Sequence, residues 1–471
     1  MSKKKIDQSR YLAYTLLNRV LEDGAYAHLV VQNYLETSGL DKRDRSFALA
    51  LFYGVLEKVY TLDFYLKKYV SRDFVSLDPA VRTILRMGAW QLLYANSVPD
   101  FAAVKESVEL LRVYSNEGAV KMGNAVLRVF SKAIHAQEIV PEKETLDVQY
   151  SLSKELVGCF KKWFGLERAE SILAAFSGMS SVCVRVNKLH IEPEQLREKL
   201  AQEGVAASDA LLLKNAAISI SLDGENPQDI KAHQDGLFMI QDEGAMLAAL
   251  VAAPKPGSKT LDVCAAPGGK SCHLAELMQN NGELIALDIY PERVKKISEN
   301  AQRLGISIIH AQEGDVTDFE ALKRAGLEPK SFDTVLADVP CSGLGLLRRK
   351  PDIRMNMTYE KIQQLLPLQE SILAESSRFV RPGGFLIYST CTVNPKENEE
   401  QIQNFLKKNE AFAPVSLEQI LIDEMGENAQ RHVDEAKLGY ITLLPDTDKC
   451  DGFFIAKLHR KKSIDSKDTV A

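Results

Sequence analysis

The first 140 residues place apolar and polar side chains at helical spacing. One predicted helix presents an apolar face made of Leu12, Leu16, Leu17, Val20 and Leu21. The same spacing predicts further helices at residues 47–55, 81–93 and 124–130. Because strand-like alternation is lacking throughout this stretch, residues 1–140 are predicted to form an all-α domain.

Basic residues recur on the polar faces of these predicted helices. They are Arg10, Lys42, Arg43, Arg45, Arg82, Arg86, Lys121 and Arg128. A solvated helix face is the ordinary explanation of such charges, and contact with RNA phosphates is the alternative. The positions alone leave both explanations open.

Residues 148–235 mix helical and strand-like patterns and predict a small α+β domain. A polar stretch at residues 135–147 reads as the linker before it. Within the domain, residues 156–176 and 194–203 are predicted to be helical, and residues 182–187 and 217–222 alternate like strands. Arg185 and Asn187 share the face of the first strand opposite its valines. Ordinary exposed polarity explains them, and an RNA-facing surface is the sharper hypothesis.

From residue 236 to residue 460, short apolar runs alternate with helical segments. The predicted strands are residues 261–264, 284–288, 307–310, 334–338 and 385–389. The predicted helices between them are residues 271–280, 291–304, 319–325 and 359–380. This rhythm is typical of a doubly wound, Rossmann-like α/β sheet. Residues 461–471 are predicted to be a disordered tail.

A proline- and glycine-rich turn follows the first strand of this sheet. It runs through Cys264, Ala265, Ala266, Pro267, Gly268, Gly269 and Lys270. A P-loop would need its first glycine at Cys264, and the Gly-x-Gly-x-x-Gly dinucleotide fingerprint is absent as well. A strand, a glycine turn and a helix still form a ligand-binding unit, because the free N–H groups of a helix start can hold an anionic group.

Acidic residues stand at the ends of the next predicted strands. Asp288 ends the second strand, Asp315 follows the third, and Asp338 ends the fourth. Ligands of open α/β sheets bind outside the carboxyl ends of the strands. A carboxylate after the second strand suits the two hydroxyls of a ribose, and the next acid can accept a hydrogen bond from an adenine amino group.

The composition is that of a globular protein with several domains. The chain has 471 residues, of which 45% are hydrophobic and 26% charged, and a net charge of −6. Residues 1–144 hold 20 Lys/Arg against 17 Asp/Glu, so RNA contact through local patches is allowed but not demanded. The longest apolar run, residues 245–254, is too short to cross a membrane, and no signal peptide is recognised. Seven cysteines without a Cys-x-x-Cys pair indicate thiols in a reducing cytoplasm and no zinc site or other metal.

Two of the cysteines fall at the same predicted sheet edge as the acids. Cys341 follows the fourth strand within Pro340-Cys341-Ser342-Gly343, and Cys391 follows the fifth. A buried cysteine is usually a small hydrophobic residue, and this explanation suits Cys159 and Cys183. The same explanation suits Cys341 and Cys391 poorly, because both lie at turns that are predicted to bind a ligand.

Several motifs together carry a resemblance to a known family. They are Asp262-x-Cys264-Ala265-Ala266-Pro267-Gly268-Gly269-Lys270, Asp338-x-Pro340-Cys341-Ser342-Gly343, Ser389-Thr390-Cys391-Thr392, Asn394-Pro395-x-Glu397-Asn398-Glu399, Gln241-Asp242 and Asp451-Gly452-Phe453-Phe454. The region from residue 180 to residue 460 thereby resembles the RNA cytosine-C5 methyltransferase family. The helical front, through Val98-Pro99, residues 104–108 and residues 124–128, resembles the RNA-binding domain of the transcription factor NusB.

The resemblance implies an activity and a role for each site residue. S-adenosyl-L-methionine is the implied methyl donor, bound by residues 264–270, Asp288, Arg293, Asp315 and Asp338. Cys391 is the implied nucleophile, which attacks carbon 6 of the cytosine. Cys341 is implied to assist product release, and Asp338 to bond the base. Because DNA cytosine methyltransferases use the cysteine of their Pro-Cys motif, Cys341 is the alternative nucleophile.

The implied substrate is one cytosine of 16S rRNA, either naked or in a small-subunit assembly intermediate. RNA contacts are expected at Arg185, Asn187, Arg348, Arg349 and Lys350, although a solvated loop explains the last three equally well. We expect a monomer with no membrane or metal partner. A methyltransferase for another RNA such as tRNA, and an RNA-binding ribosome-assembly factor, are the rival functions.

Overall fold

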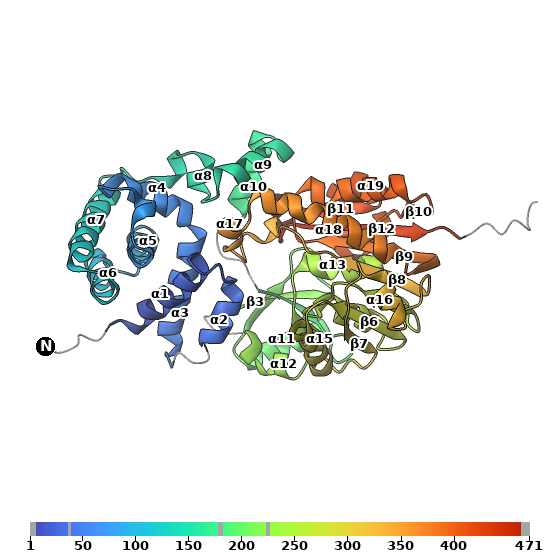
Figure 1. Cartoon of the computed structure of the whole chain (residues 1–471). Coiled ribbons are helices and arrows are strands. Elements are labelled where there is room, and N and C mark those ends of the chain that lie inside the picture. Colours follow the sequence, from blue (N-terminus) through green and yellow to red (C-terminus); the bar gives the residue numbers. More distant parts are fainter. Residues whose placement is uncertain (1–5, 36–38, 178–181, 223–226, 463–471) are drawn as a thin grey trace, which may run out of the picture. The chain divides into compact units, whose positions relative to one another are not determined.

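The computed structural model describes residues 6–35, 39–177, 182–222 and 227–462, so most of the predicted tail lies outside the described residues. The chain forms two compact units (Figure 1). The first unit comprises Met1–Ser177 and Leu347–Tyr359, and the second comprises Gly178–Leu346 and Glu360–Ala471. The helices that follow residue 148 group with the first unit. The domain boundary predicted at that residue stays a prediction.

The first unit is built from helices alone within its described residues. They are α1 (Gln8–Leu21), α2 (Ala27–Leu35), α3 (Lys42–Glu57), α4 (Val59–Tyr69), η1 (Phe74–Ser76), α5 (Pro79–Tyr94), α6 (Asp100–Tyr114), α7 (Glu117–His135), η2 (Pro141–Lys143), α8 (Leu146–Gln149), α9 (Lys154–Phe164), α10 (Leu166–Ala175) and α17 (Ile353–Asn356). The predicted all-α front is confirmed. The helix predicted at residues 124–130 is longer, because α7 begins where the Asn116 side chain accepts a hydrogen bond from the N–H group of Ala119.

Three of the basic residues predicted on helix surfaces are engaged inside the first unit. Arg10 is only 8% exposed and donates from Nε to Gln91 Oε1 at 2.7 Å. Arg86 forms a bidentate pair with Asp63, at 2.7 and 2.8 Å. Arg82 pairs with Glu22 at 3.0 Å. Pairing within the unit is a third explanation for these arginines, and the sequence did not offer it because their partners come from neighbouring helices whose positions the sequence does not give.

The segment Leu347–Tyr359 follows the Cys341 loop in sequence but packs as part of the first unit. Met355 packs against the apolar core of that unit. Asp352 accepts a hydrogen bond from the N–H group of Ala27, and Arg354 donates from Nη1 to the carbonyl of Tyr150 at 2.8 Å. We call this segment the strap.

A small antiparallel sheet opens the second unit. Its strands are ordered β2 (Ala206–Asp209), β3 (Ala217–Ser221), β1 (Val182–Val186) and β4 (Phe238–Ile240). Its helical elements are α11 (Pro193–Gln202), η3 (Pro227–Asp229) and α12 (Lys231–Gln234). The sequence predicted the first strand and α11 closely.

A large mixed sheet forms the rest of the second unit. Its strands are β5 (Lys259–Asp262), β6 (Glu283–Asp288), β7 (Ile309–Glu313), β8 (Phe332–Asp338), β9 (Val380–Thr390), β10 (Phe412–Pro414), β11 (Tyr440–Leu443) and β12 (Phe453–Arg460). The spatial order is β10-β12-β9-β8-β5-β6-β7, with β11 paired to β12. The pairs among β5 to β9 are parallel, whereas β12 runs antiparallel to β9. The predicted α/β class is confirmed, and the antiparallel part was missed.

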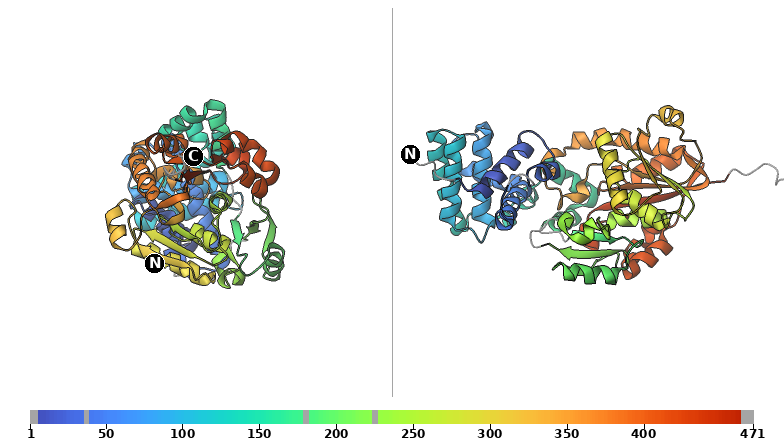
Figure 2. Two further views of the ribbon diagram at one scale, coloured as in Figure 1. Left: turned by 90° about the vertical axis from the view of Figure 1, so that its right-hand side faces the viewer. Right: turned by 90° about the horizontal axis from the view of Figure 1, so that it is seen from below.

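The remaining elements connect these strands. They are α13 (Glu243–Ala252), α14 (Gly269–Leu277), α15 (Pro291–Arg303), α16 (Phe319–Arg324), η4 (Leu344–Leu346), α18 (Tyr359–Ser377), η5 (Pro395–Glu397), α19 (Glu399–Lys408), α20 (Glu418–Met425), η6 (Gly426–His432), α21 (Val433–Lys437) and α22 (Pro445–Asp448). Helices cover both faces of the large sheet (Figures 1 and 2).

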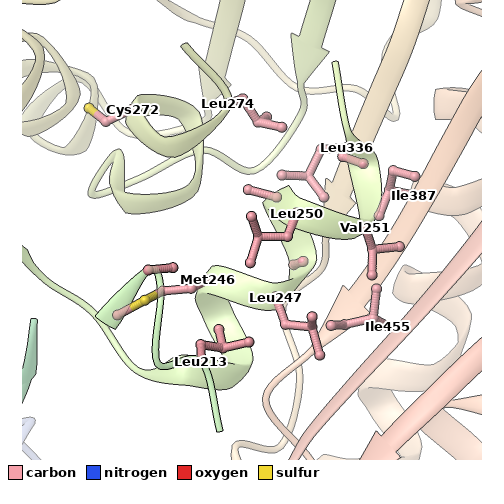
Figure 3. Close-up of a cluster of buried hydrophobic side chains, with 14 of the residues drawn as sticks. Leu213, Met246, Leu247, Leu250, Val251, Cys272, Leu274, Leu336, Ile387 and Ile455 are labelled. Carbon is pink, nitrogen blue, oxygen red and sulfur yellow. The ribbon is translucent and has the colours of Figure 1, made fainter. Parts of the chain in front are cut away.

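The two faces of the sheet bury separate cores because strand side chains alternate. On one face, Leu336 of β8, Ile387 of β9 and Ile455 of β12 pack with α13, whose Leu247 and Val251 are fully buried (Figure 3). The opposite core takes the intervening residues of these strands together with α16, α18 and α19. Packing on both faces of the sheet therefore fixes the position of each strand end. In the described residues, no helix is both long and apolar enough to span a membrane.

The strap supplies a stability prediction. Arg354 is 2% exposed, and burial lowers its pKa to about 10, so it still carries its charge at neutral pH. We expect Arg354→Ala to lower the free energy of unfolding of the first unit by about 2–3 kcal/mol, because buried carbonyls lose a charged donor. Trp90 and Trp163 both lie in the first unit, so their fluorescence during denaturation measures its unfolding.

The exposed Lys350 of the same strap provides the control, and Lys350→Ala should leave the midpoint unchanged. Equal midpoints for the two variants would contradict the anchoring role of Arg354.

Candidate active site

The glycine turn after β5 is tied to both neighbouring strands. The N–H group of Val263 donates to Leu336 O on β8 at 3.0 Å, and that of Ala265 donates to Leu287 O on β6 at 2.8 Å. Gly268 has φ +101°, and a Cβ atom there would lie 3.2 Å from Ile297 Cα. Glycine is favoured at this position because other residues rarely adopt this backbone angle, and a Cβ atom would also be crowded against Ile297. The turn is therefore a fixed edge of the sheet.

The seven residues predicted in this turn lie at different depths. Ala265 and Gly268 are buried, Cys264, Ala266, Gly269 and Lys270 are half-buried, and Pro267 is exposed. Gly269 and Lys270 open α14, where helix N–H groups have no partner within the helix.

Asp262 ends β5 and is fully buried. Its Oδ2 accepts from Ser271 Oγ at 2.7 Å, whereas Oδ1 has no partner among the described residues. Burial raises the pKa of this carboxyl to about 7, with Asp338 adding to the effect. An unsatisfied buried acceptor at the head of the turn fits a ligand that carries a hydrogen-bond donor.

Arg185 and Asn187 are not exposed, so the predicted RNA-facing role of these two residues is wrong. Arg185 is 1% exposed and pairs with Glu276 of α14 at 2.6 Å. It also bonds Gln241 and donates to the carbonyl of Gly269 at 2.7 Å. The strand face opposite the valines is covered by α14, which alternation along the strand could not reveal. Arg185 instead braces the glycine turn.

Asn187 has the same structural character. Its Nδ2 donates to the carbonyls of Gly236 and Leu304 at 2.8 and 3.0 Å, and the side chain is fully buried. The residue therefore joins the small sheet to the end of α15.

The two acids predicted for a nucleoside lie at the ends of neighbouring strands. Asp288 is 6% exposed at the end of β6, and its Oδ1 accepts from the N–H group of Tyr290 at 3.1 Å. Asp315 is exposed after β7 and accepts from Thr317. Arg293 lies with its guanidinium 5.0 Å from the centre of the Tyr290 ring, and its predicted support of Asp288 stays a prediction.

Asp338 is held by two side chains at the end of β8. Lys270 Nζ lies 2.7 Å from Oδ2, and Ser389 Oγ donates to Oδ1 at 2.7 Å. Burial lowers the pKa of Lys270, but the charge and hydrogen bond of Asp338 outweigh this, so the pKa is raised overall. The sequence predicted Lys270 only as part of the turn, and its partner lies too far along the chain to be inferred.

The two predicted active-site cysteines are in contact. Cys341 Sγ and Cys391 Sγ lie 3.2 Å apart, and both residues are half-buried. The hydrogen bond with Cys391, followed by burial, raises the pKa of the Cys341 thiol well above its ordinary value. The charge of a Cys391 thiolate contributes to raising the pKa of Lys270, so the ammonium in turn favours that thiolate.

Arg348, Arg349 and Lys350 lie in the strap. Lys350 is exposed, and the two arginines are half-buried. Their contact with RNA stays a prediction. In the described part of the chain, no group of three or more His, Cys, Asp or Glu side chains is arranged to hold a metal ion.

Known families match successive parts of the chain. The 16S rRNA methyltransferase RsmB/F family matches residues 249–459, and the NusB family matches residues 7–132. The ferredoxin-like domain of RsmF/B-like methyltransferases matches residues 155–223. A protein from Synechocystis sp. named probable ribosomal RNA small subunit methyltransferase B is 33% identical over 96% of this chain and 99% of that protein. The chain belongs to the small subunit methyltransferase B family.

Other relatives and solved structures agree with this membership. The Bacillus subtilis protein of the same name is 33% identical over 96% of this chain and 98% of its own length. The solved structure of a methyltransferase homologue from Pyrococcus horikoshii is 28% identical, covers 68% of this chain and 99% of its own, and has a TM-score of 0.55. The structure of PH0851 covers 96% of this chain and 98% of its own with a TM-score of 0.77, and at 23% identity it shows a shared fold. The family resemblance and the NusB-like front are confirmed.

Asp262 makes the stability of the second unit depend on pH. Its ordinary pKa is 3.8 and its pKa in the folded protein is about 7, so the folded state holds a proton that the unfolded state releases in this window. Its contribution to stability is complete below pH 3.8 and is lost as the pH rises through about 7. We expect Asp262→Asn to gain roughly 3 kcal/mol relative to the unsubstituted protein between about pH 5 and about pH 8.

Urea denaturation followed by circular dichroism at the two pH values measures this difference. Asp315→Asn, which changes an exposed carboxylate of the same sheet edge, should show no comparable gain. An Asp262→Asn gain that is equal at both pH values would contradict the prediction.

Proposed function

We propose that the protein transfers the methyl group of S-adenosyl-L-methionine to carbon 5 of a cytosine in 16S rRNA through a covalent cysteine adduct. The observation that carries the proposal is the pair of thiols, 3.2 Å apart, at the ends of β8 and β9 beside Asp338. The names of the relatives support ribosomal RNA as the substrate. Position 967 is the cytosine that the resemblance favours. We further propose a cytoplasmic protein that acts as a monomer.

The residues of the sheet edge fit the proposed methyl donor. Asp288 would hold the ribose hydroxyls, Asp315 the adenine amino group, and the turn of residues 264–270 the methionine part. Asp262 Oδ1 supports this fit, because it has no hydrogen-bond partner among the described residues and the amino group of the methionine part would be a suitable donor. When bound, the donor supplies an activated methyl group on a sulfonium centre.

The proposed chemistry begins with the nucleophile. The Cys391 thiolate forms a bond to carbon 6 of cytosine, which makes carbon 5 electron-rich. Carbon 5 then takes the methyl group as the methyl–sulfur bond breaks. A base removes the proton from carbon 5, and the carbon 6–sulfur bond breaks to return the thiolate. The nearby Lys270 ammonium stabilises the thiolate before the attack and after release.

Asp338 and Cys341 would handle the base and the release step. Asp338 keeps acceptor capacity beyond its bonds to Lys270 and Ser389, since an ionised carboxylate offers about four lone-pair sites. It would accept from the cytosine amino group and from the ring nitrogen once that nitrogen is protonated. Cys341 stays a thiol because its pKa is raised, so it would donate a hydrogen bond to the leaving sulfur atom of Cys391 during elimination instead of attacking.

The target base must leave its stack to reach both cysteines, and a single-stranded loop of RNA makes this least costly. The NusB-like front would hold the surrounding RNA. Exposed basic residues of that domain, Arg43, Lys121 and Arg128 among them, are the surface we propose for phosphate contacts.

Substitution of the two cysteines tests the covalent mechanism. With small-subunit rRNA and S-adenosyl-L-methionine, Cys391→Ala should lower methyl transfer at least about 10³-fold, because the nucleophile is lost. Cys341→Ala should instead accumulate a protein–RNA adduct, because release is impaired. A denaturing gel shows the adduct as a slow band, and Cys159→Ala in the first unit serves as the control with normal turnover.

Each result distinguishes one mechanism from another. A slow band with Cys391→Ala alone would reverse the roles of the two cysteines. Near-normal turnover of Cys391→Ala would overturn the assignment of Cys391 as the nucleophile. Methylation of another RNA such as tRNA, without any adduct on 16S rRNA, would keep the chemistry and reject the substrate.

Asp288→Ala tests the cofactor edge. We expect the affinity for S-adenosyl-L-methionine to fall about 10- to 100-fold, because a charged acceptor for the ribose is removed, while RNA binding changes little. Titration calorimetry measures the first quantity and filter binding the second. Glu320→Ala, an exposed acid on α16, is the control. Unchanged cofactor affinity would show that the nucleoside binds elsewhere.

A further inference from the structure

The carboxylate of Glu397 contacts the loops that carry the two cysteines and is fully buried. Its Oε1 accepts from the N–H group of Ser342 at 2.8 Å and from Gln369 Nε2 at 3.0 Å. Its Oε2 accepts from Ser342 Oγ at 2.6 Å, from Asn394 Nδ2 at 2.8 Å and from Thr392 Oγ1 at 3.4 Å. Five polar atoms that can donate thus lie within hydrogen-bond distance of one fully buried carboxylate.

These donors come from both cysteine loops. Ser342 is the neighbour of Cys341, and Thr392 is the neighbour of Cys391. The two hydroxyls also lie 2.7 Å from each other. The backbone of Glu397 is also fixed, because the hydroxyl of Tyr388 on β9 donates to the Glu397 backbone carbonyl at 2.6 Å. The carboxylate therefore spans the gap between the two loops.

The donor set indicates that Glu397 is ionised. Three of the donors are N–H groups, which cannot accept a hydrogen bond, and they reach both oxygens. Hydrogen bonds from these N–H groups to both oxygens favour the charged form of a carboxyl group over its neutral form. A negative charge therefore sits beside Cys341, where it contributes to the raised pKa of that thiol after the hydrogen bond with Cys391 and burial.

We propose that Glu397 is the positioning residue of the cysteine pair: its carboxylate holds the two loops in one register and places a negative charge on the Cys341 side, so that Cys391 is the group that attacks. The assignment of the attacking role rests on the proposed function, whereas the spanning of the two loops does not. The sequence marked this residue only as part of the Asn394–Glu399 run. No role could be given to it there, because its partners lie on other loops.

Replacement by glutamine removes the charge and keeps the shape. The amide offers one accepting oxygen and one donating nitrogen, so a donor then faces a donor. In Glu397→Gln, Cys341 should ionise at lower pH. Its rate of alkylation relative to that of Cys391 should rise about tenfold at about pH 8.

The experiment uses the full chain without RNA or methyl donor. Iodoacetamide is added at low conversion across a pH series, and peptide mass spectrometry gives the initial rates of Cys341 and Cys391 separately. Loosening of the structure alone would raise both rates together and would also expose the buried Cys272 and Cys450. Glu243→Gln, which changes another buried glutamate of the second unit that accepts from the backbone N–H groups of Leu212 and Leu213, is the matched control and should leave the ratio unchanged. An unchanged ratio in Glu397→Gln would overturn the proposed effect on Cys341.

A second variant keeps the proposal testable if Glu397→Gln does not fold. Glu397→Asp retains the charge but is too short to span both loops. Phenylarsine oxide binds two neighbouring thiols, forming two arsenic–sulfur bonds and releasing one water. We expect its affinity to fall about tenfold in Glu397→Asp, because the thiols are no longer held together, and Cys341→Ala serves as the non-binding reference. Affinity equal to that of the unsubstituted protein would overturn the positioning role.

The outcomes separate this proposal from the proposed function. Neither thiol measurement needs catalysis. If Glu397→Gln changes the alkylation ratio while Cys391→Ala still methylates RNA, the positioning role stands and the catalytic assignment fails.

Discussion

The parallel pairing of β5, β8 and β9 is the constraint on which the site depends. Parallel strands end at the same edge of a sheet, so loops that are distant in sequence meet there. The register pairs Asp262 with Leu336 and Asp338 with Ser389. The order of the strands also reverses around β5, since β6 lies on one side of it and β8 on the other. The glycine turn and the two cysteine loops consequently follow strands that end at one edge of the sheet, the edge at which such sheets bind their ligands.

Buried charges then set the chemistry of this edge. Arg185 with Glu276 and Glu397 with its donors each place an ionic group where water cannot solvate it, and Lys270 with Asp338 places a pair where solvation is only partial. Such a group is tolerated only with close partners, and removal of one partner costs more than the pair contributes. The site therefore has little freedom to rearrange, and the two sulfur atoms are kept in contact before any substrate arrives.

The five parallel strands were predictable because each is a short apolar run between turn residues. The strands β10 to β12 were missed, and the start of β12 at Phe453 and Phe454 was interpreted only as part of a family motif. The acids and cysteines of the edge followed from strand order, whereas Lys270 with Asp338 and Glu397 with Ser342 did not. Those contacts join side chains far apart in sequence. The prediction for Arg185 failed for a related reason, since alternation shows which side chains share a face of a strand but not what covers that face.

The strap has a consequence for the order in which the protein matures. A ribosome releases the chain from its amino end, and early domains ordinarily fold while later ones are still being made. Here Ala27 donates to Asp352, which is synthesised 325 residues later. Met355 and Arg354 complete the same helical unit from the same late segment. The first domain to emerge therefore lacks part of its core and the partner of the Tyr150 carbonyl until the strap, which follows β8 and Asp338 in the sequence, has also been synthesised.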